Sequence, residues 1–195
     1  MKGYRKLRNM VLKDLDGLKP NLTYHGLHHT MDVLNVINGY IRRLKLPKRE
    51  AYLLRIAALT HDMGFLVSHV EHEATSAKMA ENYMKQLGFP KSDIRQVQKM
   101  IIATKPTNPS NTKLEKILCD ADLDYLGRDD FVKISNTLYL EFRDQGIVMD
   151  YESWMRLQVK FLEFHEYQTE YAKKYRAPKK AMWLKKIKDE VATFA

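Results

Sequence analysis

The dipeptide His61-Asp62 stands at the end of the most apolar stretch of the chain, residues 51–60. This stretch has few polar residues and no Gly or Pro, so it predicts a helix that is buried on most sides. Burying an imidazole and a carboxylate together is costly unless something pairs with them, and a divalent cation suits both groups. Met63-Gly64 predicts that the helix ends there, which would let both side chains serve one ion. His-Asp pairs also occur by chance, so this hypothesis depends on further ligands elsewhere.

Three histidines lie within five residues at the start of the segment 25–44, which is predicted to be helical. His25 and His29 are four residues apart, so they project from the same face of the helix. His29 falls on the apolar stripe, whereas His28 points about a quarter-turn away, toward solvent. A single buried histidine is more often a hydrogen-bonded core residue, so this cluster alone leaves both interpretations open.

The acidic segment 118–124 offers further candidate ligands. In the predicted helix 114–126, Asp122 lies on the inward stripe of apolar residues. An aspartate on a core stripe needs a metal ion or a buried cation, so Asp122 is the predicted ligand. Asp120 shares its side of the helix with two lysines, which favours a solvated charge, and Asp124 is a borderline case.

Taken in order, His29, His61-Asp62 and Asp122 resemble the H…HD…D signature of the HD-domain phosphohydrolase superfamily. The string YHGLHHTMDV resembles the YHNxxHxxDV stretch of its cyclic-nucleotide phosphodiesterase branch, with Gly26 where Asn is usual. LTHDMG matches the HD helix of the superfamily, and DADLDYLG resembles its final-aspartate segment. The resemblance covers residues 24–126 and implies a metal-dependent phosphomono- or phosphodiester hydrolase, although some members are regulatory domains without turnover.

The chemistry of these residues and the resemblance assign the same roles. The candidate ligands of one divalent metal ion are His29, His61, Asp62 and Asp122, and the ion can be Mn²⁺, Fe²⁺, Co²⁺, Ni²⁺, Zn²⁺ or Mg²⁺. Such an ion lowers the pKa of water and neutralises charge on a phosphate. The candidate catalytic residues are His25 and Asp62. His25 lies one helical turn from His29, and the resemblance implies that it donates a proton to the leaving oxygen.

Three residues are candidate substrate contacts. His72 lies on a core stripe and is expected to touch the phosphate or a bridging water, although a core histidine is nearly as good an interpretation. Lys105, at a helix end, is the weaker candidate for a phosphate contact because such lysines usually face water. His165 is expected on the inward side of a helix, either as a pocket residue or as a hydrogen-bonded core histidine. Residues 101–104 lack the His pair with which some members hold a second metal, so we expect one ion.

The sequence predicts an all-α fold, because helical periodicity recurs throughout and no alternating strand pattern is present. With 195 residues, of which 45% are hydrophobic, we expect a single HD-type helical domain over residues 1–195. It would contain about eight to nine helices, with a core over residues 24–126 and C-terminal helices 128–195 completing the bundle. The expected helices cover residues 2–15, 25–44, 47 to the central dipeptide, 71–87, 91–103, 114–126, 130–142, 151–175 and 178 onward.

Composition narrows the possible partners and the compartment. The formal net charge of +9 favours acidic partners such as nucleotides, nucleic acid or anionic lipid. The single cysteine, Cys119, cannot form an internal disulfide, and neither a transmembrane-length apolar run nor a signal peptide is recognisable. We therefore predict a cytoplasmic protein that does not enter a membrane. Its oligomeric state cannot be predicted from the sequence.

The function expected from the sequence is hydrolysis of a small phosphorylated molecule, with a nucleotide as the favoured substrate. The first alternative is a nucleotide-binding regulatory HD domain without turnover, although an intact set of four ligands argues against a pure binding module. The second is a basic helical protein that binds nucleic acid. The basic residues are scattered and form no recognisable reading helix, so no specific nucleic acid is expected.

Overall fold

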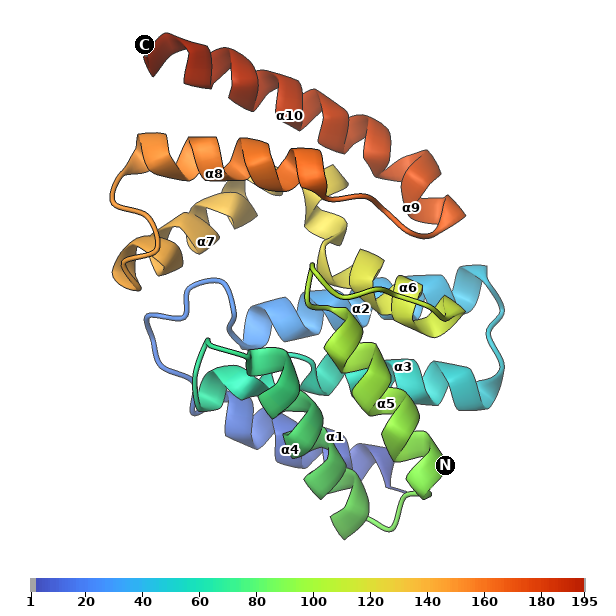
Figure 1. The fold of residues 1–195 in the computed structure, drawn as a ribbon. Helices are drawn as coiled ribbons and strands as arrows, with labels where there is room; N and C mark the ends of the chain where they lie inside the picture. The colour runs from blue at the N-terminus through green and yellow to red at the C-terminus, as the bar shows by residue number, and fades with distance from the viewer. Residues whose placement is uncertain (1–2, 195) are drawn as a thin grey trace. The chain divides into compact units, whose positions relative to one another are not determined.

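The structure is a computed structural model that describes residues 3–194, and within these residues it contains ten α-helices, three 3₁₀ helices and no strand (Figure 1). The expected all-α class is confirmed. Residue 2, where the first helix was expected to begin, lies outside the described residues. The elements are α1 (Tyr4–Leu15), α2 (Leu27–Arg43), α3 (Lys48–Thr60), η1 (Met63–Leu66), α4 (His72–Gln86), α5 (Lys91–Ala103), α6 (Lys113–Asp122), η2 (Asp124–Gly127), α7 (Phe131–Asp144), α8 (Tyr151–Phe164), α9 (Glu170–Tyr175), α10 (Ala177–Val191) and η3 (Ala192–Phe194).

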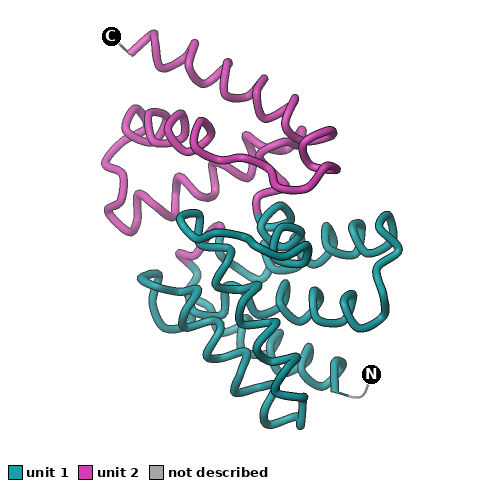
Figure 2. The backbone as a smooth tube through the Cα atoms, turned by 45° about the vertical axis from the view of Figure 1, so that its right-hand side comes forward, with its two compact units in different colours: residues 1–20, 25–122 teal, residues 21–24, 123–195 magenta. Residues whose placement is uncertain are grey.

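The chain divides into two compact units, which Figure 2 shows in different colours. Unit 1 contains the chain up to Pro20 and the range His25–Asp122, and unit 2 contains Asn21–Tyr24 and Leu123–Ala195. All four predicted metal ligands therefore belong to unit 1. The expectation of one domain, with the C-terminal helices completing its bundle, stays a prediction.

Unit 1 is built around α3, which contacts α1, α2, α4, α5 and α6. Every residue of α3 from Ala51 to Thr60 is buried except Arg55. Arg55 is half-buried, and its Nε donates a hydrogen bond to the side-chain oxygen of Asn38 on α2 at 2.8 Å. A helix that is apolar on nearly all sides gains the most hydrophobic stabilisation when every side is covered by other helices. The prediction that this stretch is an enclosed helix is confirmed.

The core of unit 2 is rich in aromatic residues, among them Tyr125, Phe131, Trp154 and Tyr167. Helices α8 and α10 pack against each other, and η2 contacts both α7 and α10. The Tyr167 hydroxyl donates a hydrogen bond to the carbonyl oxygen of Leu123 at 3.1 Å. Because the hydroxyl finds a partner, the ring can be buried without an uncompensated polar group.

The short segment between α1 and α2 is held by hydrogen bonds to α7 of unit 2. The backbone N–H of Tyr24 donates to the buried carboxylate of Glu141 at 2.8 Å, and the Thr23 hydroxyl donates to the carbonyl oxygen of Thr137 at 2.7 Å. A carboxylate that accepts from a backbone N–H makes a strong, charge-assisted hydrogen bond. These bonds explain why residues 21–24 belong to unit 2, although the chain on either side of them belongs to unit 1.

The predicted single helix over residues 151–175 is wrong, because the chain leaves helical geometry at His165 (φ −69°, ψ 132°) and α9 begins separately. The ammonium of Lys180 on α10 donates hydrogen bonds to the carbonyl oxygens of Leu162, at 3.0 Å, and of His165. Thr169 caps α9 by accepting from a backbone N–H. The break therefore depends on a contact from another helix, which hydrophobic periodicity does not reveal.

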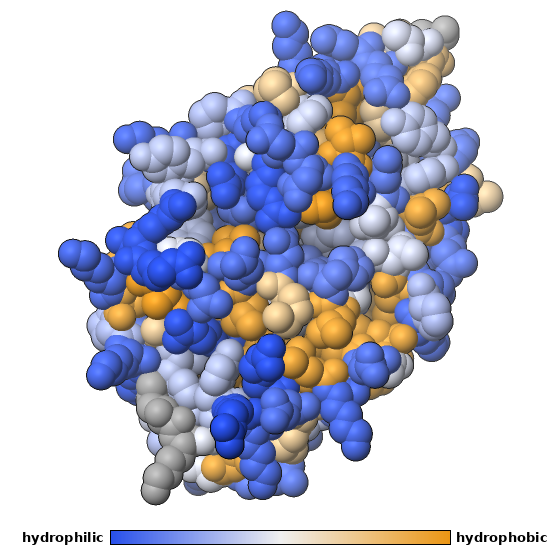
Figure 3. All heavy atoms as spheres, turned by 180° about the vertical axis from the view of Figure 1, so that it is seen from behind, coloured by the Kyte–Doolittle hydropathy of each residue, from blue (hydrophilic) through white to orange (hydrophobic). Residues whose placement is uncertain are grey.

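No helix among the described residues is long and apolar enough to cross a membrane. Figure 3 shows one face of the molecule, on which hydrophilic residues predominate and hydrophobic residues form patches between them. Apolar atoms are normal on the surface of a folded protein.

Replacing Lys180 by Met should destabilise the protein, because the end of α8 would lose the donor of its last carbonyl groups. We expect the free energy of unfolding to fall by about 1–2 kcal/mol, measured by urea denaturation. Lys185→Met is the matched control, since Lys185 is exposed on the same helix and should change stability by less than about 0.5 kcal/mol. Equal effects of the two substitutions would contradict this role of Lys180.

Candidate metal centre

His61 and Asp62 stand where α3 ends. His61 still has helical dihedral angles, whereas Asp62 (φ −107°, ψ 9°) turns the chain into η1. The Nδ1–H of His61 donates a hydrogen bond to the carbonyl oxygen of Ala58 at 2.9 Å. This bond sets the tautomer and the ring orientation, and it leaves Nε2 as the atom that can bind a metal.

The end of α3 meets His29 from the first turns of α2 and Asp122 from the last residue of α6. The Nε2 atoms of His29 and His61 are 3.3 Å apart, and Asp122 Oδ1 lies 3.0 Å and 3.2 Å from them, respectively. These three ligand atoms lie within 4.8 Å of one another. Asp62 is not part of this three-residue group, but its Oδ2 lies 3.3 Å from His29 Nε2 and 3.2 Å from His61 Nε2.

These distances fit a single divalent ion. Two ligands bonded to one ion at about 2.1 Å stand about 3.0–3.4 Å apart, and the observed separations are 3.0–3.3 Å. Asp62 Oδ2 is buried, and its partners in the structure are the ring nitrogens of His29 and His61. A buried carboxylate needs a cationic partner, and a divalent ion between these groups would supply one. His29, His61 and Asp122 therefore form a group that could hold a metal ion, and Asp62 is placed to add a fourth ligand.

The four side chains shift one another's pKa values. Burial alone would lower the pKa of His29, but the carboxylates of Asp122 and Asp62 outweigh it and raise this pKa to about 9. Burial likewise opposes the charge of His61, yet the same two carboxylates raise its pKa well above the usual range. The imidazoles in turn hold the pKa values of Asp62 and Asp122 below their usual range, against the effect of burial.

The raised pKa values of the imidazoles and the lowered pKa values of the carboxylates favour opposite charges that balance one another in the metal-free cluster. A divalent ion bound by two neutral imidazoles and two carboxylates gives the same net charge. Replacing two protons by one ion thus keeps the buried site neutral, and the ligand set matches the mixed nitrogen and oxygen donors that several divalent metals accept.

Three aromatic rings form a second group next to these ligands. His25 is half-buried, and its ring stacks on Phe65 of η1 with 4.0 Å between the ring centroids. The ring of His72, the first residue of α4, lies 4.3 Å from Phe65 and 6.1 Å from His25. His72 Nε2 is 3.6 Å from Asp62 Oδ1. Sequence reasoning missed Phe65, and only its position three residues after Asp62 could have indicated it.

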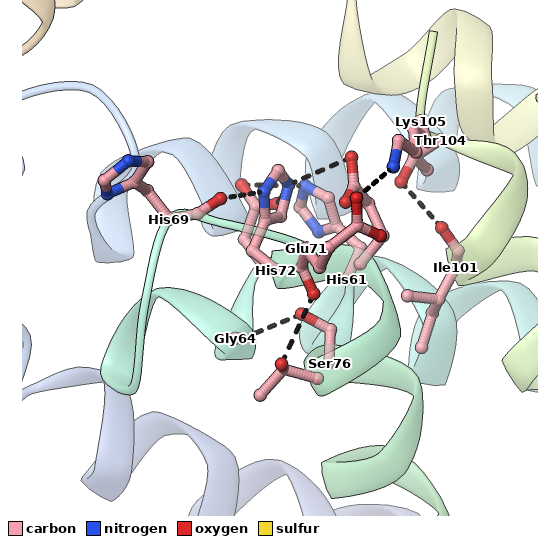
Figure 4. A network of polar contacts seen from close by, with 12 residues as sticks. His61, Gly64, His69, Glu71, His72, Ser76, Ile101, Thr104 and Lys105 are labelled. Carbon is pink, nitrogen blue, oxygen red and sulfur yellow. Dashed lines mark hydrogen bonds and ion pairs between the residues drawn. The ribbon is translucent and has the colours of Figure 1, made fainter. Parts of the chain in front are cut away.

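Gly64 allows α4 to approach the end of α3. A Cβ atom at this position would lie 2.1 Å from the carbonyl oxygen of His72, so no larger residue fits without moving α4. The Gly64 N–H donates a hydrogen bond to the Ser76 hydroxyl at 2.7 Å, as Figure 4 shows. His72 Nδ1 in turn donates to the carbonyl oxygen of His69 at 3.2 Å, which directs its Nε2 toward Asp62.

Lys105 follows the end of α5, and its ammonium pairs with the carboxylate of Glu71 at 2.5 Å (Figure 4). Glu71 directly precedes His72. A second carboxylate, of the buried residue Glu73, lies 3.6 Å from His72 Nε2. Neither glutamate was predicted from the sequence as a site residue.

His165 belongs to unit 2, so it is described apart from the ligand group. It lies just past the end of α8, not on the inward face of a helix as expected. Its ring stands perpendicular to that of Tyr167, with 4.7 Å between the centroids, and it also stacks with Phe161. Its role as a substrate contact stays a prediction.

The expectation that Asp120 is solvated is wrong, because only 1% of its surface is exposed. The reason is that α6 is covered by α2, α3 and α5, so more than one narrow stripe of this helix is buried. Asp124, the borderline case, is also buried and accepts a hydrogen bond from Nε of Arg176 at 2.8 Å.

A family model described as HD domain matches residues 26–124, which is just over half of the chain. The matched range contains His29, His61, Asp62 and Asp122. Comparisons with curated proteins and with solved structures gave no match.

Removing one ligand should release the ion, because the three remaining side chains cannot balance its charge in a buried site. Elemental analysis of dialysed Asp122→Ala should therefore find almost no divalent metal. The matched control is Asp93→Asn, which alters a buried carboxylate of α5 that pairs with Arg49 outside this group and should keep the ion. Full metal occupancy of Asp122→Ala would contradict the assignment.

Removing the metal should make stability depend on pH in a defined direction. An unfolded histidine titrates at about pH 6.5, whereas the pKa of His29 in the metal-free fold is about 9. The stability contributed by His29 is therefore complete below about pH 6.5 and is lost as the pH rises through about 9. Urea denaturation of the chelator-treated protein should show this decline in the free energy of unfolding.

A saturating divalent ion should abolish that decline, because the ion binds neutral imidazoles and gains affinity as their protons leave. His29→Gln should flatten the decline in the metal-free protein, and His28→Gln should leave it intact because His28 is exposed. A metal-free protein whose stability is constant across this pH range would show that the charges of the cluster are assigned wrongly.

Proposed function

The chain belongs to the HD domain family, whose members are mostly metal-dependent phosphohydrolases, and we propose that it hydrolyses the phosphate ester of a small molecule, with a nucleotide as the favoured substrate. The observation that carries this proposal is the convergence of His29, His61 and Asp122, joined by Asp62, on ligand atoms 3.0–3.3 Å apart. A buried group of this composition is costly to keep unless it binds an ion.

Four protein ligands leave coordination positions of the ion for water and substrate. When bound, a divalent ion supplies a nucleophile from water near neutral pH and neutralises negative charge on a phosphoryl oxygen. The hydrogen bond of His61 to Ala58 keeps one ligand ring in a fixed orientation. Asp62 would act both as a ligand and as a catalytic residue, with Oδ2 next to the ligand rings and Oδ1 3.6 Å from His72 Nε2.

His25 is the proposed proton donor to the leaving oxygen. Its ring centroid is 6.1 Å from that of His29, so it is near the ligands without belonging to their group. Stacking on Phe65 restrains its ring, and its half-buried position lets a substrate reach it. A positioned acid of this kind typically accelerates a reaction by about 10²–10⁴-fold.

His72 is the proposed contact to the substrate phosphate or to the attacking water. Its Nδ1 is occupied by the carbonyl oxygen of His69, which leaves Nε2 for this task. Lys105, whose ammonium pairs with Glu71 directly before His72, is the second proposed phosphate contact. A screen of nucleoside monophosphates, cyclic nucleotides and nucleoside triphosphates with the metal-loaded protein tests the proposal, and no turnover of any phosphate ester would favour the regulatory alternative.

Replacing His25 by Ala should separate proton donation from metal binding. The variant should keep its ion and its fold, and its kcat should fall by about 10²–10⁴-fold on the natural ester. The loss should be much smaller on a nitrophenyl ester, because nitrophenolate leaves without being protonated. Initial rates on both esters, with metal content measured in parallel, check this expectation.

The control for this variant is His28→Ala, since His28 lies in the same helix start but is exposed and should have little effect. An equal loss on both esters would mean that His25 positions the substrate or supports the metal. An unchanged kcat on the natural ester would remove His25 from the mechanism.

A further inference from the structure

An ion pair joins the start of α4 to the end of α5. The carboxylate of Glu71 and the ammonium of Lys105 are 2.5 Å apart, and the two helices next to them, α4 and α5, pack against each other. Glu71 adopts the left-handed region (φ 51°, ψ 39°), which is unfavourable for residues other than glycine. This conformation turns the chain at the N-terminus of α4 and directs the Glu71 side chain to Lys105 (Figure 4).

The pair adjoins His72, the other proposed phosphate contact. Glu71 directly precedes His72, whose Nε2 is 3.6 Å from the ligand Asp62 and 3.6 Å from the buried carboxylate of Glu73. The Lys105 side chain is 32% exposed and that of Glu71 is 64% exposed, so a substrate can reach both. Glu71, Glu73 and Lys105 therefore lie close to His72, and the charge of Lys105 is already paired with that of Glu71.

We propose that Glu71 determines substrate selectivity by acting through Lys105, an inference that rests on the proposed function. Its carboxylate holds the ammonium, so a substrate phosphate has to compete with Glu71 for Lys105. Each further negative charge on a substrate would also be repelled by the exposed carboxylate of Glu71. The pair therefore favours a phosphate ester of low charge, a monoester or a cyclic diester, over a polyphosphate.

The expected effects are modest, because both partners of the pair are partly exposed to water. Exposed ion pairs change an equilibrium by about two- to five-fold, and salt screens them. Glu71→Gln should therefore tighten the binding of inorganic phosphate by about two- to five-fold, and the binding of tripolyphosphate by more than that. Both gains should disappear at high salt.

A double-mutant cycle measured by calorimetry tests whether Glu71 acts through Lys105. The probes are inorganic phosphate and tripolyphosphate, each added to the protein with and without its divalent ion. Lys105→Met should weaken the binding of both probes, and in that background Glu71→Gln should no longer tighten the binding of phosphate. The matched controls are Glu81→Gln and Lys85→Met, because these residues form an ion pair of 2.6 Å on the same helix. Neither control should change binding.

Three outcomes would overturn the inference: no binding of phosphate to the unsubstituted protein, no tightening by Glu71→Gln, or the same tightening in the Lys105→Met background. The binding assay does not depend on turnover. Tightening that requires Lys105 would therefore support the inference even if no ester is hydrolysed, which would be a failure of the proposed function alone. Hydrolysis without that tightening would leave the proposed function in place and reject the role of Glu71.

Discussion

The meeting of two buried imidazoles with the buried carboxylate of Asp62 and the half-buried carboxylate of Asp122 is the constraint on which the rest of unit 1 depends. His61 is fully buried, and His29 and Asp62 are each 6% exposed, so water cannot balance their charges. The group is neutral with two extra protons or with one divalent ion, and the ion returns the imidazoles to the form that binds metals. Desolvation would destabilise any one of these charges in isolation. The cluster avoids this penalty when its charged groups stay together or bind a cation.

The helices that pack around α3 position the residues of this cluster. Because α3 is enclosed by five helices, its C-terminal end lies inside unit 1, where α2 and α6 can deliver His29 and Asp122. Gly64 then lets α4 approach, and Phe65 provides a surface for the rings of His25 and His72. The ligand group and the proposed acid are therefore positioned by two successive features, the end of one helix and the short 3₁₀ turn that follows it.

Much of this arrangement could be predicted from the sequence, because the strongest signals are local. The apolar run before His61-Asp62 predicted the central helix, and spacing along stripes predicted His29 as an inward residue. Asp122 was also predicted to face inward; it is half-buried, and its carboxylate meets His29 and His61. Features that depend on tertiary contacts could not be predicted. The break at His165 depends on Lys180 from another helix, and the burial of Asp120 depends on three helices that cover α6. The ion pair of Glu71 with Lys105 joins residues 34 positions apart, which no local pattern reveals.

The central claim is that one ion, held by this cluster, makes the chain a phosphohydrolase. The most direct test is a titration of chelator-treated protein with a divalent ion while the hydrolysis of a phosphate ester is followed. We predict no turnover without metal, a linear rise with added ion, and saturation at about one ion per chain. Turnover that persists in the chelated protein, or that keeps rising until two ions per chain are bound, would contradict the account.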